Sequence, residues 1–156
     1  MTGLDQQVHQ LVAERDCQRL VHDYAWLVDS GAASGVADLF TDDGVWLGAD
    51  GRGMHSQEEI RKGFAQREGL ARRTSRHVMT NLRIDANGTD HAVGTAYLIN
   101  YRHDAAGGTA AHPAPAGHPK FVGDYHFTFR RTPAGWRIET LRFELAFLRE
   151  RGAQPG

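Results

Sequence analysis

Two residue types suited to acid–base chemistry stand out, a histidine on a predicted strand and an aspartate at the end of a predicted helix. His77 lies in the segment 76–84, whose apolar and β-branched residues indicate a strand. An imidazole can be charged or neutral near neutral pH, which suits proton transfer. Asp29 ends the first helical segment, and Tyr24 precedes it on the same segment. The residues alone leave simpler interpretations open: a hydrogen-bonded histidine in a sheet, a carboxylate at a helix end and a tyrosine in the core.

The elements that would position these residues can be predicted from periodicity. Apolar residues at spacings of three and four predict a helix over residues 8–28, with Tyr24 on its buried stripe. A short helix capped by Ser34, a turn at 41–44, a short strand at 45–47 and a helix after the capping-box segment 56–59 are expected next. Four strands are predicted near 75–85, 91–102, 120–131 and 136–148, with a long loop over 104–119 at the mouth of a pocket.

Helices followed by an antiparallel meander predict an α+β domain. We expect one domain over residues 1–150 and a disordered tail over residues 151–156. A strongly curved sheet wrapped against the helices would leave one concave pocket.

Composition narrows the class of partner. The 156-residue chain has a formal net charge of −1, so nothing draws it to nucleic acid or to an anionic membrane. No apolar run approaches a membrane span, and the N-terminus lacks a secretory signal pattern. Cys17 is the single cysteine, which excludes an internal disulfide and fits a reducing cytoplasm. The nine histidines show no HExxH pattern, so we predict no metal site. The run of basic residues over 61–76 is interpreted as a solvated face.

Four segments, 19–31, 36–46, 76–84 and 123–138, resemble the SnoaL-like branch of the nuclear transport factor 2-like (NTF2-like) superfamily. The resemblance spans nearly the whole chain in the same order of elements. It implies a cone-shaped, curved antiparallel sheet wrapped around the N-terminal helices, the cystatin-like α+β barrel.

Within that superfamily, Tyr24, Asp29 and His77 are similar to the site of scytalone dehydratase, bile acid 7α-dehydratase and lindane dehydrochlorinase, which are cofactor-free lyases. The resemblance implies that His77 is the base, that Asp29 orients it and that Tyr24 hydrogen-bonds a carbonyl or leaving oxygen. The dehydrochlorinase has a lysine in place of the tyrosine, which favours oxygen chemistry here. Asn100 lies on the strand where the bile acid enzyme has an acidic residue, which weakens any transfer of that substrate.

Other residues are candidates for contacting a substrate. Asn81 shares strand parity with His77, so it either faces the pocket or holds a turn or bulge. His126 alternates with Tyr125 along its strand, and either face of that strand could line the cavity. The full set of expected substrate contacts is Asn81, Asn100, His126, Trp46, Met54, Tyr97 and Phe121.

The sequence thus favours a cytoplasmic, cofactor-independent lyase of the dehydratase type acting on a mostly apolar small molecule. A SnoaL-type polyketide cyclase or an isomerase is the nearest alternative, and a non-catalytic ligand carrier or accessory subunit is the other. The resemblance also implies a homo-oligomer that associates through the outer sheet face, with a dimer preferred over a trimer.

Overall fold

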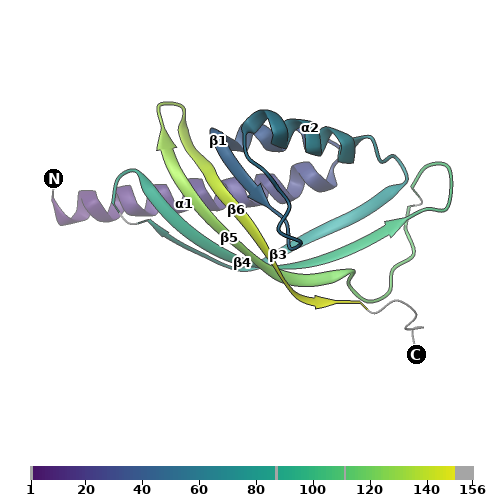
Figure 1. The fold of residues 1–156 in the computed structure, drawn as a ribbon. Coiled ribbons are helices and arrows are strands. Elements are labelled where there is room, and N and C mark those ends of the chain that lie inside the picture. The colour runs from purple at the N-terminus through teal and green to yellow at the C-terminus, as the bar shows by residue number, and fades with distance from the viewer. Residues whose placement is uncertain (1, 87, 111, 150–156) are drawn as a thin grey trace.

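A long N-terminal helix lies across the concave side of a curved sheet (Figure 1). The computed structural model describes residues 2–86, 88–110 and 112–149, so the predicted tail over 151–156 lies outside the described residues. Helix α1 spans Gly3–Asp29 and begins with a capping box between Thr2 and Asp5. Only its C-terminal two thirds carries buried residues, and its first turns project past the edge of the sheet (Figure 1).

Two shorter helical segments follow α1. The 3₁₀ helix η1 spans Ala33–Leu39, and α2 spans Gln57–Glu68. Ser56 caps α2 as predicted, because its hydroxyl accepts the backbone N–H of Glu59 at 3.1 Å. The prediction that Ser34 caps the second helix is wrong, since η1 begins after Ala32 without a side-chain cap.

Six strands form the sheet: β1 (Phe40–Leu47), β2 (Gly53–Met54), β3 (Arg73–Ala86), β4 (His91–Asp104), β5 (Phe121–Thr132) and β6 (Gly135–Leu148). Their order is β2-β1-β6-β5-β4-β3. The meander β3 to β6 is antiparallel as predicted, but β1 pairs with β6 in parallel, so the sheet is mixed. The sheet is curved and open, because β2 and β3 remain at its two edges. The predicted turn at 41–44 is instead an irregular part of β1, where the register with β6 shifts between Phe40 and Val45.

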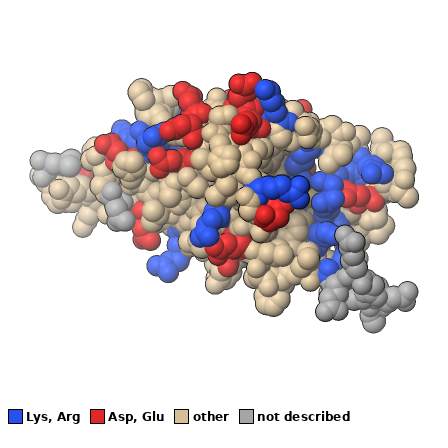
Figure 2. Space-filling view, viewed as in Figure 1, with Lys and Arg blue, Asp and Glu red and all other residues tan. Residues whose placement is uncertain are grey.

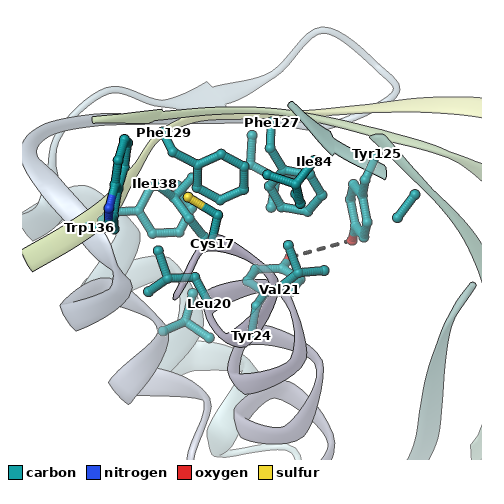
Figure 3. Close-up of a cluster of buried hydrophobic side chains, with 14 of the residues drawn as sticks. Cys17, Leu20, Val21, Tyr24, Ile84, Tyr125, Phe127, Phe129, Trp136 and Ile138 are labelled. Atoms are coloured by element: carbon teal, nitrogen blue, oxygen red, sulfur yellow. Dashed lines mark hydrogen bonds between the residues drawn. The ribbon is translucent and has the colours of Figure 1, made fainter. Parts of the chain in front are cut away.

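The core lies between α1 and the inner face of the sheet. Cys17, Leu20 and Val21 of α1 pack under aromatic rings from β5 (Figure 3). Burial alternates along β5, with Tyr125, Phe127 and Phe129 facing inward. In the described part of the chain no helix is long and apolar enough to span a bilayer.

Candidate active site

Asp29 and His77 meet where the C-terminal end of α1 crosses β3. The Nδ1 atom of His77 lies 2.7 Å from Asp29 Oδ1, and the backbone N–H of His77 donates to Asp29 Oδ2 at 2.5 Å. The hydroxyl of Ser75 also donates to Asp29 Oδ1, at 2.8 Å. The His77 and Asp29 side chains are only 8% and 11% exposed. An ionised Asp29 that accepts from Nδ1–H fixes the imidazole tautomer and leaves Nε2 unprotonated.

The surroundings of Asp29 keep it ionised. Burial raises its pKa, but the hydrogen bonds from His77 and Ser75 outweigh burial, so the pKa lies below its usual value. Ser75 in turn accepts a hydrogen bond from Arg67 Nη2 at 2.9 Å. A chain of donors therefore runs from Arg67 through Ser75 to the carboxylate that holds His77.

Asn100 lies on the other side of the imidazole. It is paired with His77 across β3 and β4, and its Nδ2 lies 3.3 Å from His77 Nε2. Asn100 is 2% exposed, and its Oδ1 is buried with no hydrogen-bond partner among the described residues. The amide thus donates weakly to the bare nitrogen and keeps one acceptor unused.

His77 borders a cavity of about 610 Å³ between α2, the β1–β2 loop and the inner face of the sheet. Most of its lining is apolar, as is usual for small-molecule sites. The polar groups that line it with His77 are Tyr24, Tyr125, Trp46, Arg67, Arg102 and Asp50. A hollow of about 460 Å³ approaches Asp29 and His77 from the other side, between α1 and β3.

Three aromatic side chains form a hydrogen-bonded group in this cavity. Trp46 Nε1–H donates to the Tyr24 hydroxyl at 3.0 Å. The Tyr24 hydroxyl lies 3.4 Å from the Tyr125 hydroxyl (Figure 3). Burial raises the pKa of Tyr24, and burial raises the pKa of Tyr125 well above its usual value. Both phenols therefore stay protonated at neutral pH and can donate a hydrogen bond.

The structure brings together most of the residues that the sequence singled out. Tyr24, His77 and Asp29 converge, and Asn100 joins them through the imidazole. The predicted apolar walls Trp46, Met54 and Phe121 all line the cavity.

Three of the expected substrate contacts do not reach the cavity. Tyr97 is 53% exposed, because it is one of the outward-facing residues of β4, whereas Leu98 and Asn100 face inward. His126 lies on the same outer side, because it alternates along β5 with the inward-facing Tyr125. Its Nε2 lies 3.3 Å from Glu144 Oε2, but the geometry does not form a hydrogen bond. Asn81 is exposed and sits in a β-bulge with φ of 51°. The bulge alternative is therefore the correct one for Asn81.

Two residues of the site, Arg67 and Tyr125, are not among those predicted from the sequence. The basic run over 61–76 is predicted to be a solvated face, but Arg67 follows the buried Ile60 and Phe64 at helical spacing and so shares their side of α2. Tyr125 lies on the face of β5 that carries Phe127 and Phe129, opposite His126, and the alternation along this strand left open which of the two faces is buried.

The long segment 104–119 was expected at the mouth of this pocket. Residues 112–118 instead line a separate hollow of about 540 Å³ beside the start of β3 and the end of β4. None of the described residues of the segment lines the cavity of His77. The lining of this cavity includes residues of the β1–β2 loop and of the end of β6, namely Gly48, Ala49, Leu145 and Leu148.

The fold and the site define a small α+β pocket protein built around an aspartate–histidine pair. Residues 9–142 match the family of SnoaL-like domains, so the chain belongs to the SnoaL-like family. A search of curated protein sequences gave no match.

Solved structures share the fold over almost the whole chain. An NTF2-like protein with a cystatin-like fold from Novosphingobium aromaticivorans is 22% identical, with 93% of this chain and 89% of that chain covered and a TM-score of 0.77. A protein of the same organism, described provisionally as a scytalone dehydratase, is 20% identical, with 93% of each chain covered and a TM-score of 0.74. A protein of unknown function from Mycobacterium tuberculosis is 21% identical, with 95% and 78% covered and a TM-score of 0.72. Identities of this size show a common fold, and the reaction has to be argued from the site.

Proposed function

We propose that the protein is a cofactor-independent lyase of the dehydratase type, in which His77 is the base. The observation that carries the proposal is the set of three hydrogen bonds on Asp29, which hold His77 with Nδ1 on the carboxylate and Nε2 unprotonated. The SnoaL-like family includes dehydratases, isomerases and cyclases, which supports acid–base chemistry in this cavity. A purely structural histidine would not need a cavity of about 610 Å³ beside it.

The proposed first step is proton abstraction next to a carbonyl. His77 Nε2 takes a proton from the carbon, the C–H electron pair moves into the enolate, and the imidazole becomes a cation beside ionised Asp29. A hydroxyl on the next carbon then leaves with the proton that His77 returns, so that water and an unsaturated carbonyl compound are formed. General acid–base help of this kind contributes about 10²- to 10⁴-fold.

The phenols provide the donors for the developing oxyanion. Because the Tyr24 hydroxyl accepts from Trp46, its own proton is directed to Tyr125 or to a ligand oxygen. Tyr125 is a second candidate donor beside Tyr24, because the Tyr125 hydroxyl can accept from Tyr24 and donate its own proton into the cavity. A donor aimed at an oxyanion is worth about 10²- to 10³-fold.

Asn100 suits both protonation states of the base. Its amide N–H donates to neutral Nε2 at 3.3 Å, a long bond that a substrate proton can displace. After proton transfer a rotated amide could present the unpartnered Oδ1 to the new Nε2–H.

The test is turnover by His77→Ala in a screen of β-hydroxy carbonyl compounds, with product mass as the readout. We expect the variant to lose about 10²- to 10⁴-fold in kcat while its circular dichroism spectrum stays that of the wild type. His126→Ala is the matched control, because it removes the same side chain from the outer face of the sheet. Equal activity of His77→Ala and wild type would overturn the mechanism.

The same screen separates the alternatives. Dehydration lowers the mass by one water, whereas cyclisation without water loss or isomerisation conserves it. A carrier or accessory subunit would instead release an unchanged ligand, detectable by native mass spectrometry. A cytoplasmic location and a small-molecule substrate without nucleic-acid or membrane partners belong to the same proposal.

A further inference from the structure

One charged group of the cavity is left out of the proton-transfer chemistry. Arg67 lines the same cavity as His77, on the side of α2 that also carries Phe64. Of the five N–H donors of a guanidinium, one is used, in the 2.9 Å bond from Nη2 to Ser75. Its Nε–H is buried and has no hydrogen-bond partner in the described part of the chain.

The neighbouring arginines share a carboxylate, whereas Arg67 forms no direct ion pair among the described residues. Arg73 and Arg102 both bind Asp104, with shortest distances of 2.7 and 2.6 Å. Asp29, the other carboxylate near Arg67, already accepts hydrogen bonds from His77 and Ser75. Among the described carboxylates, none forms an ion pair with Arg67.

Arg67 is also only partly solvated. Burial lowers its pKa, and the charges of Arg73 and Arg102 act in the same direction, while the charge of Asp29 opposes them only in part. A half-buried cation without a direct ion pair is costly, and an anion that enters the cavity and contacts it would reduce that cost. Lys and Arg side chains gather at the end of the molecule that carries the β4–β5 loop (Figure 2), which would favour the approach of an anion.

We propose that Arg67 binds an acidic group of the substrate, so that the substrate class is an apolar, ring-sized molecule carrying a carboxylate or a comparably acidic oxygen. This inference rests on the proposed function for the identity of the cavity as the substrate site. Arg67 and His77 both reach Asp29, Arg67 through Ser75, so the acidic group would be held at the end of the cavity where the proton is removed. The apolar walls Trp46, Phe64 and Phe143 would take the ring.

The test compares two probes that differ in charge and little in shape, 2-naphthoate and 2-naphthamide, by isothermal titration calorimetry. We expect the wild type to bind 2-naphthoate about 10- to 100-fold more tightly, the range for a hydrogen bond to a charged group. Arg67→Gln should abolish this preference, so that the two probes bind with similar affinity. Arg72→Gln is the matched control, since it removes the same charge from an exposed position close in sequence, and it should keep the preference.

The inference is overturned if the wild type binds the two probes equally or binds neither, and these results do not depend on any variant folding. It is also overturned if Arg67→Gln keeps the preference, or if Arg72→Gln loses it to the same extent. Failure here is distinct from failure of the lyase mechanism, because the probes report binding and His77→Ala reports turnover.

Discussion

At the scale of single residues, the Asp29 carboxylate accepts three hydrogen bonds from another element of the fold. It accepts from a side-chain hydroxyl, a backbone N–H and an imidazole, all from β3. These bonds attach the end of α1 to the strand that carries the base. The same carboxylate therefore orients His77 and joins two elements of the fold.

This dual role predicts how stability depends on pH. Because the folded pKa of Asp29 lies below its ordinary value of 3.8, the unfolded chain binds more protons in the interval between the two values. The stabilisation from Asp29 is fully present above pH 3.8 and is lost as the pH falls through the folded pKa. Urea unfolding of wild type and Asp29→Asn should show a difference in the free energy of unfolding at neutral pH that shrinks on acidification. A difference that stays constant down to acid pH would contradict this prediction.

At the scale of elements, the bulge in β3 decides which residues face the cavity. Ser75, His77 and Met79 face inward before it, and Leu82, Ile84 and Ala86 face inward after it. The pairing with β4 shifts between Thr80 and Arg83, which inserts one extra residue and reverses the parity. The bulge therefore lets one strand contribute both the base and, farther along, the hydrophobic core.

Asn81 holds this bulge with φ of 51°, a conformation that β-branched residues strongly disfavour. Asn81→Val should lower the free energy of unfolding by about 1–2 kcal/mol, measured by urea denaturation. Asn81→Gly is the control and should stay close to wild type, since glycine adopts this conformation without strain. If the two variants were equally stable, the bulge would not depend on the backbone preference of this residue.

At the scale of the whole molecule, the outer face of the sheet exposes several apolar side chains. Val78, Tyr97, Tyr101 and Phe147 are between 39% and 72% exposed. Register places Val78 beside Ile99, and Tyr97 beside Thr80, on the side of the sheet away from the helices. A patch of this kind is typical of a protein interface.

We propose that this outer face forms the contact of a homodimer, with a trimer as the alternative. Tyr97→Asp should convert the dimer to monomer, because it places a charge in the apolar contact, and light scattering after size-exclusion chromatography measures the mass. Leu4→Asp is the control, since Leu4 is 68% exposed on the part of α1 that projects past the sheet. A wild-type protein that is monomeric, or a Tyr97→Asp variant of unchanged mass, would contradict the proposal.

Sequence periodicity by itself determined the long helix, the capped α2 and the four-stranded meander, because these elements depend on local spacing and local hydrogen bonds. It also pointed to Tyr24, Asp29 and His77, although their meeting was implied by a family resemblance and not by the spacing. Only the tertiary structure decided that Asp29 reaches across to β3, that β1 pairs in parallel with β6 and that Tyr125 faces inward in place of His126.

The physical reason is that these features depend on contacts between segments far apart in the chain. Alternation along β5 defines two faces, but only packing against α1 selects which one is buried. Arg67 illustrates the same difference. The sequence places it on the buried side of α2 by helical spacing. Only the tertiary structure shows that Arg67 forms no ion pair among the described residues, because the neighbouring Asp104 binds Arg73 and Arg102.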